Sequence, residues 1–179
     1  KKTIIYFAGL FQRAQIEYND IAKDLPSYNH IYINTNFDNR DILKDTLVKI
    51  IDDLSEFNIE CVVGFSFGGS LALQFKELFN TELNCILISP SGFKSNTILE
   101  KAIRTISNFL YSLYCNDKWY ILQSYPLYQN TNTLGNTDYI IISTSDVIHY
   151  PLQIKNHINC INLKNVSHLN MIKVISKQS

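Results

Sequence analysis

The sequence lacks an excess of charge of either sign. Sixteen Lys and Arg residues balance sixteen Asp and Glu residues in a chain of 179. No global electrostatic field therefore recruits nucleic acid or an anionic membrane surface. The sequence also has neither a hydrophobic run long enough to cross a bilayer nor a secretory signal at its start. These absences predict a cytoplasmic protein with no nucleic-acid partner and no membrane span.

Cysteine is scarce as well. The four cysteines stand singly, and three of them fall inside apolar, strand-like runs; they are Cys61, Cys85, Cys115 and Cys160. Cysteines in this pattern are typical of free buried thiols in a reducing compartment, and they predict neither a disulfide framework nor a metal site. A chain of 179 residues can bury one sizeable core and is short for two. We therefore expect a single domain over residues 1–179.

The pentapeptide Gly64-Phe65-Ser66-Phe67-Gly68 is the motif around which the chain is organised. The apolar run 61–63 precedes it, and a helix-forming run begins at Ser70. A G-x-S-x-G motif between a strand and a helix is typical of a nucleophilic serine on a strained turn, where glycines avoid a steric clash. Ser66 would then lie at the positive end of the helix, beside the backbone N–H of Phe67 as an oxyanion donor. The alternative is a glycine-rich turn with an incidental serine.

Short apolar runs alternate with amphipathic runs along the whole chain. Strands that are apolar over several residues and are separated by helices indicate a parallel sheet covered on both faces. The expected fold class is α/β, with an open, mostly parallel six-stranded sheet and helices on both faces. The expected strands are 3–7, 30–33, the strand that leads to Ser66, 83–88, 138–143 and 157–163. Helices are expected over 12–24, 40–57, after Ser66 and from about 168; the first would bury Ala14, Ile16, Ile21 and Leu25.

The connection between residues 88 and 138 is far longer than a single crossover helix requires. Residues 97–114 have helical spacing, and aromatic residues crowd in and after this stretch, including Tyr111 and Trp119. One interpretation is a crossover helix followed by a packed loop. The other is a short helical lid, inserted at about 93–134, whose tyrosine-lined inner face covers Ser66. We expect the lid, because long insertions are usually functional and α/β sheets bind ligands at the carboxyl ends of their strands.

A serine nucleophile needs a base, and the base needs a group that orients it. Of the four histidines, His168 follows the last expected strand and precedes the closing helix. Asp146 follows the strand before it, although an aspartate in that place is by itself best explained as a turn or cap residue. Ser66, Asp146 and His168 each lie just past the end of an expected parallel strand. The sequence therefore predicts that the three form one catalytic site.

These motifs resemble those of the α/β-hydrolase superfamily, over essentially the whole chain. The stretch from Gly64 to Gly69 resembles the nucleophile motif of that superfamily, and Asp146 with Pro151 resembles its acid loop. Val166-Ser167-His168-Leu169 is similar to its histidine loop. The resemblance implies a truncated form of the fold, without the first two strands of the superfamily, and the strand order 2-1-3-4-5-6.

The first strand of that superfamily usually runs into His-Gly-x, whose third residue supplies the second oxyanion N–H. Phe7-Ala8-Gly9-Leu10 occupies this place, so the resemblance implies that Leu10 joins Phe67 in the oxyanion hole. Ala8 departs from the usual histidine. The implied chemistry is acyl transfer to water through an acyl-enzyme on Ser66, with no metal and no cofactor.

The expected substrate is a small-molecule carboxylic ester or thioester with an apolar acyl group. We expect substrate contacts from Phe11, Arg13, Phe65, Tyr111 and Trp119. The stretch Phe7-Ala8-Gly9 is also similar to the oxyanion loop of some pimeloyl-acyl carrier protein methyl ester esterases of biotin synthesis. Basic residues outnumber acidic ones in the lid, as an acidic carrier protein would require, and an ordinary solvated helix face explains the same excess.

Two functions of other classes stay open. The same fold serves non-catalytic receptors, in which the pocket binds a ligand and the catalytic residues have decayed. An aromatic lid would also suit a subunit that binds a protein partner. All three catalytic residue types are present in this sequence, which favours the enzyme.

Overall fold

The computed structural model describes residues 1–9, 12–34, 42–91, 134–146 and 154–177. Nearly all of the lid expected at about 93–134 lies outside these ranges, as do four predicted site residues: Leu10, Phe11, Tyr111 and Trp119. Within the described ranges, none of the helices has the length and apolar character needed to cross a membrane.

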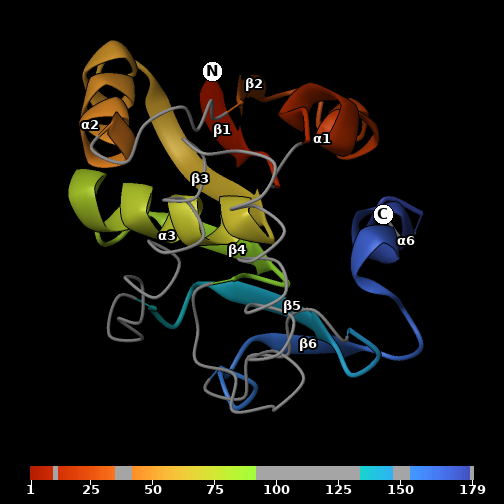
Figure 1. Ribbon diagram of the computed structural model, residues 1–179. Helices are drawn as coiled ribbons and strands as arrows, with labels where there is room; N and C mark the ends of the chain where they lie inside the picture. The colour runs from red at the N-terminus through yellow and green to blue at the C-terminus, as the bar shows by residue number, and fades with distance from the viewer. Residues whose placement is uncertain (10–11, 35–41, 92–133, 147–153, 178–179) are drawn as a thin grey trace, which may run out of the picture.

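Six strands form one open sheet in the order β2-β1-β3-β4-β5-β6 (Figure 1). All the strand pairings are parallel. The strands are β1 (Lys2–Phe7), β2 (Asn29–Ile33), β3 (Asn58–Phe65), β4 (Asn84–Ile88), β5 (Tyr139–Ser143) and β6 (Cys160–Leu163). The predicted fold class and strand order are confirmed. β6 begins later than expected because residues near His157 form a turn, in which the Cys160 N–H donates to the His157 carbonyl at 3.1 Å.

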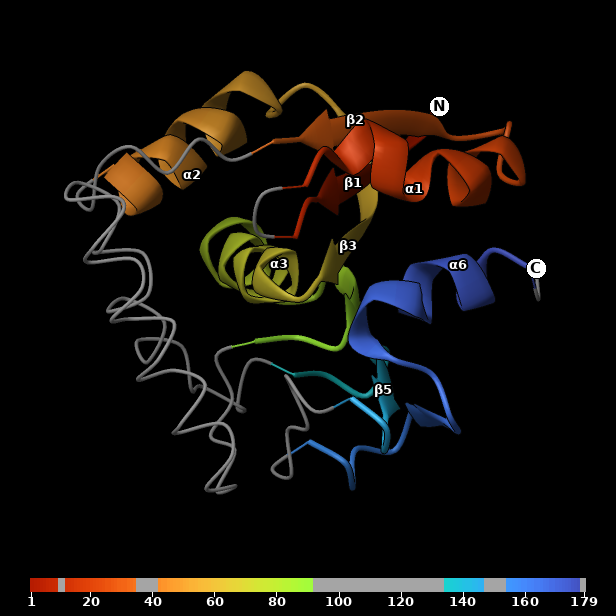
Figure 2. The same cartoon turned by 45° about the vertical axis from the view of Figure 1, so that its right-hand side comes forward.

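Helices cover both faces of the sheet. Figure 2 shows α2 (Ile42–Asp53) and α3 (Phe67–Phe79) on one side of the strands, with α1 (Ala14–Lys23) and α6 (Met171–Ile175) on the other. The short 3₁₀ helix η3 (His168–Asn170) leads into α6. Each face has its own buried cluster, because successive residues of a strand point to opposite faces. In β3, Val62 belongs to the cluster beneath α3, and Val63 belongs to the cluster beneath α1.

The buried face of α1 differs from the predicted one. Ala14, Tyr18 and Ala22 are buried, whereas Ile16 is 74% exposed. These three residues are four apart, and Tyr18 can be buried because its hydroxyl donates to the Phe7 carbonyl at 2.9 Å. The expectation that Ile16 points inward was therefore wrong. Because the Tyr18 hydroxyl has a hydrogen-bond partner, Tyr18 can be buried, and the face of α1 that carries Tyr18 packs against the sheet instead of the face that carries Ile16.

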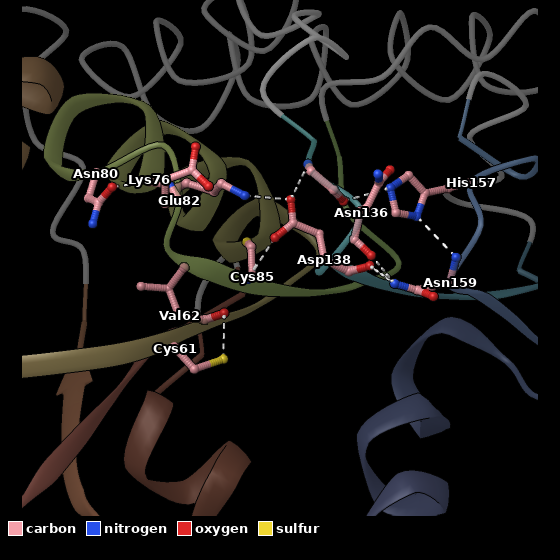
Figure 3. Close-up of polar contacts among 11 residues, drawn as sticks. Cys61, Val62, Lys76, Asn80, Glu82, Cys85, Asn136, Asp138, His157 and Asn159 are labelled. Atoms are coloured by element: carbon pink, nitrogen blue, oxygen red, sulfur yellow. Dashed lines mark hydrogen bonds and ion pairs between the residues drawn. The ribbon is translucent and has the colours of Figure 1, made fainter.

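A buried ion pair joins α3 to the start of β5 (Figure 3). Lys76 Nζ lies 2.6 Å from Asp138 Oδ2, and the two side chains are only 1% and 0% exposed. Asp138 also accepts the backbone N–H groups of Gly135 at 2.7 Å and Cys85 at 2.8 Å. A buried charge is tolerated only with such partners, so these contacts hold α3 and β4 to β5 at the end of the sheet where β5 begins.

Asp138→Asn should lower the free energy of unfolding by about 3–5 kcal/mol, because it leaves the Lys76 ammonium buried without a counter-charge. Chemical denaturation followed by circular dichroism measures the change. Lys23→Met is the control, because Lys23 forms a solvent-exposed ion pair, with its Nζ 3.3 Å from Asp20 Oδ1. The control should cost at most about 1 kcal/mol. Equal losses in the two variants would show that the buried pair contributes no more than a surface pair.

Candidate active site

Ser66 lies in a strained turn between β3 and α3. Its backbone has φ 53° and ψ −117°, a conformation that costs a non-glycine residue about 1–3 kcal/mol. Backbone hydrogen bonds hold it there: the Ser66 N–H donates to the Ile88 carbonyl at 2.9 Å, and the Ser66 carbonyl accepts from Gly69 and Ser91 at 3.0 and 2.9 Å. The strand-turn-helix geometry predicted from the motif is present, and the turn is attached to the end of β4.

The glycines of the motif are explained by contacts between backbones. A Cβ on Gly64 would overlap the carbonyl group of Gly68. A Cβ on Gly68 would overlap the carbonyl oxygens of Phe7 and Ala8 at the end of β1. Only glycine allows these approaches. They bring the first turn of α3, which begins at Phe67, against the segment that leads to Leu10.

His168 and Asp146 meet in a buried hydrogen bond. Asp146 follows β5, and His168 begins η3 after β6. His168 Nδ1 lies 2.6 Å from Asp146 Oδ2, with the side chains 7% and 0% exposed. A carboxylate in this position places the imidazole proton on Nδ1, so that Nε2 is the basic nitrogen. The Phe65 ring packs against His168 with the ring centroids 4.7 Å apart.

Ser89 is a residue of this cluster that sequence analysis missed. Its hydroxyl donates to Asp146 Oδ2 and lies 3.2 Å from His168 Nδ1. The residue follows β4 with φ 42°, and its N–H donates to the Ile141 carbonyl at 2.7 Å. In the sequence it belongs to Ser89-Pro90-Ser91-Gly92, a stretch typical of a turn. The available signal was its place just past a parallel strand, beside the strand that carries Ser66.

Arg13 and Phe65, two of the predicted substrate contacts, line the same pocket. The pocket has a volume of about 450 Å³ and lies between α1 and α6. Leu169, the residue after His168, is 68% exposed and lines it as well. The other lining residues are Gln12, Ile16, Glu17, Asp20, Ile172, Lys173 and Ser176. The lining therefore combines apolar and charged side chains. It includes Phe65 and Leu169, the neighbours of Ser66 and His168 in the chain.

No protein-family model matches the sequence, and no curated protein matches it. Solved structures do match its fold over 99% of the chain. An esterase from Pyrococcus furiosus is 16% identical with a TM-score of 0.62, and 78% of that chain is covered. A carboxylesterase from Nitrososphaera gargenis is 14% identical with a TM-score of 0.64 and 86% covered. The thioesterase RedJ from Streptomyces coelicolor is 9% identical with a TM-score of 0.60 and 85% covered.

These likenesses, taken with the strand order and the turn at Ser66, identify the fold. The chain has an α/β-hydrolase fold with a six-stranded parallel sheet. At such low identity the likeness concerns the fold alone, and an activity depends on the residues of the site.

Ser89→Ala should lower the free energy of unfolding by about 1.5–3 kcal/mol, because the buried Asp146 carboxylate loses a hydrogen-bond donor. Thermal and urea unfolding measure the loss. Ser55→Ala is the control: the exposed Ser55 hydroxyl donates to the Asp52 carbonyl at 2.8 Å, and its removal should change stability by no more than about 0.5 kcal/mol. A Ser89 variant as stable as the control would mean that Asp146 does not depend on this hydroxyl.

Proposed function

We propose that the chain is a serine hydrolase that cleaves a carboxylic ester or thioester through an acyl-enzyme on Ser66. The observation that carries the proposal is the buried hydrogen bond between His168 and Asp146, at the edge of the sheet where the Ser66 turn lies. Two further contacts support it. The Phe65 ring, next to Ser66 in the chain, packs against His168. Ile88, whose carbonyl accepts the Ser66 N–H, is followed by Ser89, which contacts His168 and Asp146.

In this mechanism, His168 Nε2 removes the hydroxyl proton as Ser66 Oγ attacks the substrate carbonyl carbon. Asp146 keeps Nδ1 protonated and stabilises the imidazolium that forms. The N–H groups of Phe67 and Leu10 bind the tetrahedral oxyanion, and each such donor typically lowers the barrier by about 3 kcal/mol. The imidazolium then protonates the leaving alcohol or thiol. A water molecule, activated by the same base, releases the acid and restores Ser66.

The pocket between α1 and α6 supports a substrate with an apolar part, because Phe65, Leu169 and Ile172 supply apolar surface. Its charged lining is mixed: Arg13 and Lys173 are cations, and Glu17 and Asp20 are carboxyl residues. Within this lining, Arg13 is the cation proposed to meet a substrate carboxylate. A narrower proposal is the methyl ester of pimeloyl-acyl carrier protein, with the carrier protein as partner. It is supported by the similarity of residues 7–9 to that group of esterases.

Ser66→Ala should abolish hydrolysis of short-chain and medium-chain nitrophenyl esters and should change the free energy of unfolding by no more than about 1 kcal/mol, since only one hydroxyl is removed. Ser145→Ala, an exposed serine beside Asp146, is the control and should hydrolyse the esters as the wild type does. Equal rates in wild type and Ser66→Ala would refute the nucleophile. A folded wild type with no ester hydrolysis would favour a non-catalytic binding protein on the same scaffold.

Arg13→Ala should raise KM for an ester whose acyl chain ends in a carboxylate by about twofold to fivefold, the range that an exposed ion pair provides. The KM for a neutral ester of the same length should not change, because that substrate has no charge for Arg13 to meet. Lys49→Ala removes an exposed cation of α2 and serves as the control. The same KM for the acidic ester in wild type and Arg13→Ala would remove Arg13 from the substrate site.

A further inference from the structure

Two consecutive side chains of α1 contact the end of β1 and the residues that follow it. Glu17 Oε2 accepts the Gly9 N–H at 3.2 Å, and the Tyr18 hydroxyl donates to the Phe7 carbonyl at 2.9 Å. The Gly9 carbonyl in turn accepts the Gln12 N–H at 3.1 Å. Gly9 is therefore anchored through both of its backbone polar groups. It is the residue directly before Leu10, whose N–H is an oxyanion donor in the proposed mechanism.

Gly9 is also tightly enclosed. A Cβ at this position would lie 2.9 Å from Gln12 Oε1 and 3.2 Å from Phe65 Cδ1. The Phe65 ring packs on its other neighbour, His168, with the ring centroids 4.7 Å apart. A displacement of Gly9 would therefore disturb the residue before the nucleophile, and through it the base. The hydrogen bond that the Gly9 N–H donates to Glu17 is the side-chain contact that opposes such a displacement.

The environment of the Glu17 carboxyl disfavours its charged form. Oε2 has the Gly9 N–H as its partner, whereas Oε1 is buried and has no hydrogen-bond partner among the described residues. Burial raises the pKa of this carboxyl from its ordinary value of 4.5 to about 7, and the Gly9 hydrogen bond opposes the shift only in part. Arg13 directly before α1, Asp20 of α1 and Lys173 of α6 line the same pocket, and Tyr18 is adjacent in the chain. In the described part of the chain, none of them forms an ion pair with Glu17.

A largely buried carboxyl, one of whose oxygens has no hydrogen-bond partner among the described residues, lowers stability, and a role in positioning would compensate for that loss. We propose that Glu17 is a positioning residue that holds the Gly9 backbone, directly before the proposed oxyanion donor in the chain, through the Gly9 N–H. This inference rests on the serine-hydrolase function proposed above. Glu17 acts through Gly9 and Leu10 and takes no part in bond making. Its removal should therefore slow the chemical step and leave substrate binding almost unchanged.

Kinetics of Glu17→Ala and Glu17→Gln on a neutral nitrophenyl ester test the proposal. Glu17→Ala should lower kcat by about tenfold or more, as misplaced catalytic groups do, with KM within about twofold of wild type. Glu17→Gln can still accept the Gly9 N–H through its amide oxygen, so it should keep kcat within about threefold of wild type. Rates are taken per folded protein. Gln15→Ala, an exposed residue of the same helix, is the control and should match wild type.

The pH dependence of stability gives a readout that does not need activity. The pKa of Glu17 is higher in the folded protein than in the unfolded chain, so the folded state binds the extra proton. Wild-type stability should therefore fall relative to Glu17→Gln as the pH rises from about 5 to about 8. Parallel melting curves across this range would show that Glu17 carries no shifted ionisation, and the account of its environment would be wrong.

The two proposals fail in different ways. If wild type hydrolyses the ester and Glu17→Ala has the same kcat as Gln15→Ala, the positioning role is overturned and the serine hydrolase stands. If the kcat losses of Glu17→Ala and Glu17→Gln are equal, the hydrogen bond to Gly9 is not the cause and the inference is again overturned. If folded wild type hydrolyses no ester, the proposed function fails, and the positioning role of Glu17 fails with it. A pH-dependent difference in stability between wild type and Glu17→Gln would then show that Glu17 has a structural role only.

Discussion

The close contact between the start of α3 and the end of β1 is the constraint on which the rest of the site depends. The Gly68 backbone lies against the carbonyl oxygens of Phe7 and Ala8, so the helix and the strand can approach this closely only while position 68 has no Cβ. Hydrogen bonds from the end of β4 hold the same turn from the other side and stabilise the positive φ of Ser66. One local arrangement thus positions the Ser66 hydroxyl, the N-terminus of α3 and the segment that leads to Leu10.

Two buried aspartates near the ends of β5 differ in the partners that they hold. Asp138, just before the strand, pairs with Lys76 and accepts two backbone N–H groups. Asp146, just after the strand, accepts hydrogen bonds from His168 and Ser89. The lysine partner gives Asp138 a fixed counter-charge. The imidazole partner of Asp146 can take up and release a proton, which is what the proposed acyl transfer requires.

The strands and their order could be predicted because a buried parallel sheet needs apolar runs, and the resemblance supplied the order. The glycines of the turn were predictable for a similar reason, since backbone contact excludes every other residue. Ser89, Glu17 and the partner of Asp138 could not be predicted. Each depends on a contact between side chains or backbone groups that only the folded chain brings together, and locally each residue is an ordinary turn or helix residue. The burial of Tyr18 likewise depends on a carbonyl of β1.

Reaction of the wild type with a fluorophosphonate, followed by intact mass measurement and identification of the modified peptide, tests the central claim most directly. Such a probe modifies a serine only when a base activates it and donors stabilise the oxyanion. A nucleophile at Ser66 predicts one adduct per chain, on the peptide that contains Ser66, and none in Ser66→Ala. A folded wild type that remains unmodified, or an adduct on another residue, would contradict a serine nucleophile at position 66.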